Sequence, residues 1–204
     1  MTTPNVMPMF PLGTVLFPTM LLPLHVFEPR YRALVDDCIA GDGEFGVTLI
    51  ERGSEVGGGD VRTDVGTVAR IVQVERFEDG RFAVAAVGTR RIRIERWLAD
   101  DPYPRAEVVD WEDVGTTGTA LDDADALFRR ALALAAELGE APAPLDVELA
   151  DDPAMATFQI GALAPLGPLD RQALLATERP DDRVTLLVAQ LTDVVELLRA
   201  RLGR

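Results

Sequence analysis

The spacing of apolar and polar positions changes about halfway along the chain. Up to about residue 115, apolar residues form short runs or alternate with polar ones, which is the period of β-strands. From residue 121 onward they recur every three or four positions, as on the buried face of a helix. The pattern predicts an α+β protein with a β-rich region at 1–115 and an α-helical region at 116–204.

Six or seven short strands are expected in the first region. The strongest signal is a hairpin in which apolar runs flank the turn at Asp79-Gly80. The strict alternation in "RRIRIERW" places Ile92 and Ile94 on one face and the arginines on the other, solvated face. The remaining strands are expected at 7–12, 21–27, 45–51 and 103–112. This number of short strands with one inserted helix predicts a closed or half-closed barrel.

The opening stretch "FPLGTVLFPTMLLPLHVFEPRY" is apolar but contains four prolines. It lacks the basic residues that should precede a signal peptide, and its prolines would break a membrane helix. We interpret it as two strands and a connecting loop. Pro29 then begins a helix, since its missing N–H is not needed in the first turn. The predicted buried face of that helix is Tyr31, Leu34, Val35, Cys38 and Ile39, with Gly41 as its C-terminal cap.

Helices are expected after residue 121. Asp152-Pro153 is a typical start, with aspartate as the N-cap and proline in the first turn. The last helix should bury Val184, Leu187, Val188, Leu191, Val195, Leu198 and Leu202. The glycine-rich segment 52–64 is interpreted as a connecting loop.

Charge and cysteine content narrow the possible partners. The net charge is −14, which disfavours nucleic acid and anionic membranes. The single cysteine, Cys38, excludes an internal disulfide, and a reducing, cytoplasmic location is expected.

The side chains that most catalytic mechanisms require are absent or occur only once in this chain. The chain has no lysine, one serine (Ser54), one histidine (His25) and one cysteine (Cys38). A Walker loop, a Schiff base and a Ser-Lys dyad all need lysine. His25 has no histidine partner for a metal site, and Cys38 lies on the expected core face of a helix. We therefore expect no enzymatic activity, no metal and no cofactor.

Several segments together resemble one known family, the N-terminal substrate-binding domain of Lon protease in its stand-alone bacterial form. The segments that carry the resemblance are "MFPLGTVLFP" (9–18), "LPLHVFEPRY" (22–31), "FGV" (45–47), "DVGTVARI" (64–71), "DGR" (79–81) and "VGTRRI" (87–92). The helical region is similar more loosely, through "DRQALL" (170–175) and "DRV" (182–184). One departure is Thr19, where the family often has glycine.

The resemblance implies a pseudo-barrel related to the PUA fold, followed by a C-terminal helical bundle. It also implies a non-catalytic module that grasps unfolded or damaged polypeptide. Cereblon shares a domain of this kind as an interaction module. We expect the ATPase and protease parts of Lon to be absent from this chain.

Candidate substrate-binding residues are apolar side chains near the start of the chain: Leu16, Phe17, Met20, Leu21, Phe27 and Tyr31. Most of them should be buried, and we hypothesise that a minority stay exposed in a groove between the two halves. Glu28, Arg30 and Tyr31 could form a recognition cluster or a plain ion pair beside a packed ring. The expected partners are unfolded or flexible polypeptide segments, with a protease or chaperone as a further candidate. Two alternatives remain open: a small-molecule pocket between barrel and helices using Trp97 or Trp111, and a scaffold that recruits a separate protease.

Overall fold

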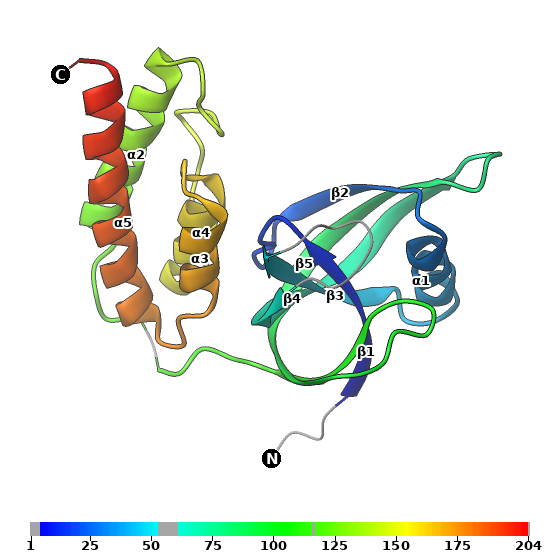
Figure 1. Ribbon diagram of the computed structural model, residues 1–204. Coiled ribbons are helices and arrows are strands. Elements are labelled where there is room, and N and C mark those ends of the chain that lie inside the picture. Colours follow the sequence, from blue (N-terminus) through cyan, green and yellow to red (C-terminus); the bar gives the residue numbers. More distant parts are fainter. Residues whose placement is uncertain (1–4, 53–60, 116, 204) are drawn as a thin grey trace. The chain divides into compact units, whose positions relative to one another are not determined.

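The computed structural model describes residues 5–52, 61–115 and 117–203 (Figure 1). The chain forms two compact units that divide between Glu112 and Asp113. The first unit contains β1 (Asn5–Leu12), β2 (Leu21–Val26), α1 (Pro29–Ala40), β3 (Glu44–Arg52), β4 (Val61–Arg76), β5 (Phe82–Trp97) and β6 (Arg105–Asp110). The second contains α2 (Asp122–Glu137), α3 (Pro153–Leu163), α4 (Pro168–Leu175) and α5 (Pro180–Arg201).

The strands of the first unit form one sheet that closes on itself. Their order is β2-β5-β4-β3-β1-β6, and an additional pairing of β5 with β6 completes a ring. β1 and β3 are parallel, and the other pairs are antiparallel. The predicted barrel is therefore present as a closed ring of β1, β3, β4, β5 and β6.

β2 stands outside this ring. The long strand β5 has β4 along one edge, while its other edge pairs first with β2, at residues 82–87, and then with β6, at residues 92–97. Among the described strands, β2 pairs with β5 alone, so its second edge carries no strand partner.

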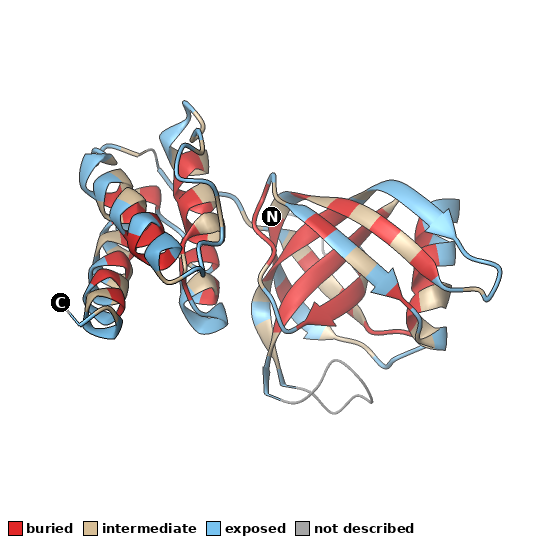
Figure 2. Ribbon diagram, turned by 90° about the horizontal axis from the view of Figure 1, so that it is seen from above, coloured by how far each residue is buried: buried red, intermediate tan, exposed pale blue. Residues whose placement is uncertain are grey.

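The core of the first unit fills the inside of the barrel and the space under α1 (Figure 2). Tyr31 of α1 stacks on Phe10 of β1, with ring centroids 4.1 Å apart. Tyr31, Leu34, Val35 and Cys38 are buried as predicted, and Gly41 caps the helix. Ile39 was predicted to be buried but is 48% exposed. It follows Cys38 by one position, about 100° around the helix, and the face that α1 turns to the barrel is too narrow to include it.

Three other sequence predictions need correction. The runs expected as separate strands at 81–87 and 90–97 form the single strand β5. Arg91, expected on a solvated face, is 4% exposed, and its guanidinium lies 4.6 Å from the centre of the Trp111 ring. Val61–Asp64, expected in a loop, belongs to β4. Arg52, also expected in that loop, is the last residue of β3, and residues 53–60, with Ser54, lie outside the described residues.

The second unit consists of helices whose apolar faces pack together. Asp152 caps α3 as predicted, because its side chain accepts a hydrogen bond from the N–H of Met155. Val188 and Leu202 are only partly buried, but the rest of the predicted α5 face is buried. α5 also buries Arg183, which the apolar pattern did not predict. Its guanidinium makes a bidentate pair with Asp113 at 2.6 and 3.0 Å and lies 3.8 Å from the centre of the Phe158 ring. The paired carboxylate and the ring compensate the cost of burying this charge.

Candidate functional site

The loop between β1 and β2, residues 13–20, is held against the barrel by two of the motif residues. The hydroxyl of Thr67 donates a 2.6 Å hydrogen bond to the carbonyl of Leu16. Gly88 lies directly beneath the next residue, since a Cβ built there would come 2.2 Å from the carbonyl oxygen of Phe17. The motifs "VGTV" and "VGTR" therefore include residues that bring the loop backbone into contact with β4 and β5.

The end of this loop is a β-bulge. Thr19 donates its N–H to the carbonyl of Gly88 at 2.7 Å, and the N–H of Gly88 donates to the carbonyl of Met20 at 2.9 Å. Thr19 and Met20 thus lie opposite the single residue Gly88, and Thr19 has φ 66°. Glycine is the usual residue at that position because a β-branched side chain is strained at positive φ.

Two large side chains of the anchored loop are buried. Leu16 is 4% exposed and Phe17 is 1% exposed. Met20 is partly buried and packs against the same core cluster. Of the candidate binding residues, Leu16 and Phe17 thus contribute to the core of the first unit.

From β2 onward, some large apolar side chains are exposed. Leu21 is 61% exposed and Phe27, just after the strand, is 57% exposed. Tyr31 is buried, with the Arg30 guanidinium 4.5 Å from its ring centre, and Arg30 pairs with Glu28 at 3.1 Å. The cluster of Glu28, Arg30 and Tyr31 is an ion pair beside a packed ring.

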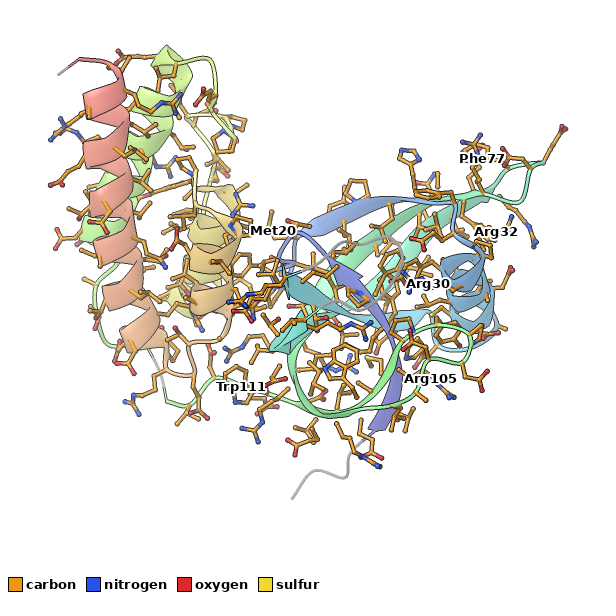
Figure 3. The ribbon with its side chains drawn as sticks, in the orientation of Figure 1. Met20, Arg30, Arg32, Phe77, Arg105 and Trp111 are labelled. Carbon is orange, nitrogen blue, oxygen red and sulfur yellow. The ribbon has the colours of Figure 1, made fainter. Side chains whose placement is uncertain are left out.

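Two of the hollows that adjoin β2 are lined in part by Phe27. The larger, of about 330 Å³, lies where β2 ends beside the tip of the β4–β5 hairpin, and its lining is His25, Val26, Phe27, Phe77, Arg81 and Phe82. The smaller, of about 190 Å³, lies between β2, β1 and the start of α1, and its lining is Phe10, Leu12, Pro23, Leu24, His25, Val26, Phe27, Glu28 and Tyr31. Figure 3 shows Phe77 near the hairpin end and Arg30 at the start of α1.

We use the name "β2 surface" for the exposed side chains at these hollows and along the strand, namely Leu21, Pro23, His25, Phe27, Phe77 and Arg81. The sequence had indicated Leu21 and Phe27 but not Phe77, which is 38% exposed. The available signal was an apolar residue beside the Asp79-Gly80 turn, where a hairpin tip is normally polar.

Apolar side chains predominate in the lining of both hollows. Cys38 is buried, and burial raises the pKa of its thiol to about 12, so the reactive thiolate is disfavoured. Among the described residues, no group of three or more His, Cys, Asp or Glu side chains could hold a metal.

Trp97 and Trp111 each lie under an arginine, Arg62 at 4.5 Å and Arg91 at 4.6 Å from the ring centres. None of the described helices is both long and apolar enough to span a membrane.

Comparison with known proteins identifies the class. Residues 6–193 match the model of the ATP-dependent protease La (LON) substrate-binding domain. The chain therefore belongs to the Lon substrate-binding domain family, and the resemblance inferred from the motifs is confirmed. The match is to the substrate-binding domain of Lon, and no protease domain is seen in this chain.

Individual relatives agree with this assignment. The chain is similar to a Lon N-terminal domain protein from Xanthomonas campestris, with 30% identity, a TM-score of 0.68, and coverage of 91% of this chain and 98% of that one. The N-terminal domain of the Mycobacterium avium complex Lon protease has the same fold, at 23% identity and a TM-score of 0.61, with 93% and 99% coverage. Lon protease 2 of Herpetosiphon aurantiacus is 29% identical over 94% of this chain. This chain spans only 24% of that relative.

Proposed function

We propose that this chain is a polypeptide-binding module that recognises unfolded or flexible protein segments through its β2 surface. The observation that carries the proposal is the exposure of Leu21, Phe27 and Phe77 beside two hollows, where apolar side chains from separate segments of the first unit gather. Exposed apolar side chains gathered at a hollow are typical of interaction sites. Membership of a substrate-binding family supports a polypeptide ligand, because the substrates of a protease are polypeptides.

The charge of the chain supports the same ligand class. The chain carries 34 acidic and 20 basic residues, so neutral or basic segments would be favoured at long range. Unfolded chains expose the apolar side chains that these hollows can bury, whereas folded proteins hide them. We also propose that the first unit is related to the PUA fold and that the second is a helical bundle, as the resemblance implies.

A binding experiment with matched variants tests the proposal. Fluorescence anisotropy would compare a labelled, permanently unfolded protein, reduced and carboxymethylated lactalbumin, with its folded form. The full chain should bind only the unfolded form. The double variant Leu21→Ser/Phe27→Ser should bind on the order of tenfold more weakly, because each side chain loses apolar burial with the ligand.

The control for this experiment is the double variant Leu169→Ser/Leu197→Ser. These leucines of the second unit are 63% and 60% exposed, so they match Leu21 in exposure. Equal losses of affinity in both double variants would show that exposed apolar side chains bind non-specifically. That result would contradict the binding role proposed for the β2 surface. Binding to folded proteins alone would favour a scaffold that recruits a protease.

A further inference from the structure

We propose that the bound segment pairs with the unoccupied edge of β2 as an additional strand of the sheet. This inference rests on the proposed function and specifies how the polypeptide is held. β2 is joined to β5 along one edge, and no described strand pairs with the other. A free edge presents backbone donors and acceptors that an extended peptide satisfies.

The register of β2 shows which residues offer these groups. The N–H of Gly88 donates to Met20, so the backbone of Met20 faces β5. The pairing continues without a break from Leu21 to Val26, and backbone direction alternates along an antiparallel strand. Leu21, Pro23 and His25 therefore direct their backbone groups away from β5. Proline, which has no N–H to donate, is tolerated at such an outward position of an edge strand.

The free edge of β2 has few of the features that usually protect an edge strand from pairing. No charged side chain occurs between Leu21 and Val26, in a chain of net charge −14. Native edge strands are commonly protected by charges, bulges or proline; here the bulge at Thr19 and Met20 lies before the strand, and within Leu21–Val26 only Pro23 has that role. Leu21 and His25 each offer a donor and an acceptor, while Pro23 offers only its carbonyl. The edge can thus hold a short segment of foreign chain.

A second copy of this chain fits the edge less well. If two β2 strands paired about a twofold axis at Pro23, proline would face proline and both sides would lack the central donor. A foreign segment without proline keeps its own donor there. Two copies would also bring together chains of charge −14, which repel each other. The occupant we infer is therefore an extended segment of another polypeptide.

Side chains of the bound segment would enter the smaller hollow. That hollow is lined by Leu12, Leu24, Val26 and Tyr31 and touches β2 without involving β5, so it lies on the unpaired side. Leu24 and Val26 direct their side chains to the face opposite that of Pro23 and His25. An added strand would place alternate side chains next to them, which favours segments with apolar residues at every second position.

Backbone methylation of a peptide tests the pairing without altering the protein. The probe is a fluorescein-labelled peptide of alternating valine or phenylalanine and threonine, with an arginine at each end. One version is N-methylated at the valine and phenylalanine amides, and the other at the threonine amides. Only one set of amides can face β2, so one version should lose at least about tenfold in affinity while the other stays within about twofold.

A pair of protein variants provides the second measurement. His25→Pro and His25→Ala both remove the imidazole, but only proline removes the N–H. The proline variant should bind the unmethylated peptide about fivefold to tenfold more weakly than the alanine variant. Tryptophan fluorescence checks that the first unit remains folded, and if His25→Pro unfolds it, the methylated peptides decide.

The outcomes separate this inference from the proposed function. Equal affinity of the three peptides overturns edge pairing, and binding of unfolded lactalbumin would then leave the proposed function standing. Binding of unfolded lactalbumin without binding of any peptide also overturns edge pairing. If neither probe binds, both proposals fail. A chain that dimerises and binds no peptide identifies a second copy as the occupant and overturns the inference.

Discussion

Residues 13–20 and residues 21–28 are neighbouring parts of one apolar stretch, yet the fold covers them to different extents. The first buries Leu16 and Phe17 almost completely, whereas the second buries Leu22 and Val26 but leaves Leu21 and Phe27 more than half exposed. The difference does not come from hydrophobicity, since both parts contain several large apolar side chains. It comes from what lies beneath the backbone: Thr67 and Gly88 bind the first part to the barrel, whereas the second part forms an edge strand.

This contrast assigns different roles to residues that look alike in the sequence. A side chain of the anchored loop contributes to the free energy of unfolding. A side chain of the β2 surface should contribute to binding instead. Four pairs of substitutions test how far the separation holds.

The largest effect is expected from the two phenylalanines. Phe17→Ala should lower the free energy of unfolding by about 3–5 kcal/mol, because it leaves a cavity in the core. Phe27→Ala should change it by less than about 0.5 kcal/mol, because that ring is mostly in water. Denaturant unfolding followed by tryptophan fluorescence reports on the first unit, since Trp97 and Trp111 both lie in it. Similar losses in both variants would remove the distinction between the two segments.

Gly88→Ala should destabilise the first unit by roughly 1–3 kcal/mol. The added Cβ would lie 2.2 Å from the carbonyl oxygen of Phe17, so the anchored loop would have to move. Gly118→Ala is the control, because the nearest atom to its Cβ would be 3.7 Å away. If Gly88→Ala has the same unfolding midpoint in denaturant as the wild type, the close approach of the loop to Gly88 does not contribute to stability.

Thr67→Val should cost about 1–2 kcal/mol, since the buried carbonyl of Leu16 would lose its hydrogen bond while the volume stays nearly the same. Thr89→Val is a matched change, because the Thr89 hydroxyl also donates to a backbone carbonyl, that of Val68 at 3.1 Å, but its side chain is exposed. Unfolding curves of the two variants should therefore differ. A larger loss for Thr89→Val would contradict the anchoring role of Thr67.

Thr19→Gly should have the smallest effect and the opposite sign. Thr19 has φ 66°, which costs an L-residue about 1–2 kcal/mol and costs glycine nothing. Part of this gain is offset by the greater entropy of glycine in the unfolded chain, so a net stabilisation of about 0.5–1 kcal/mol is expected. A higher midpoint in denaturant would be the readout, and Thr19→Ala, which keeps a Cβ at positive φ, should not reproduce it.

The sequence was most informative where a residue type has one dominant local use. Pro29 at the start of α1, Gly41 at its end and Asp152 as a cap are each set by backbone geometry within a turn. The barrel strands followed from alternation, and the family followed from the motifs. Ile39 and Arg91 were wrongly placed, because periodicity gives the direction of a side chain but not what stands opposite it. Arg183 was missed because its burial depends on Asp113, which lies 70 positions away.

By itself the sequence determined the order of elements, the family and the absence of lysine chemistry, because these depend on local geometry and on the inventory of side chains. It could not determine which half of the apolar stretch is covered, since that depends on Thr67 and Gly88, which are distant in the chain and adjacent only after folding. Tertiary structure alone left β2 with one edge that no described strand pairs with, because β5 is long enough to pair with β6 beyond β2. Strand pairing is a relation between separate segments, and so a single segment cannot encode it.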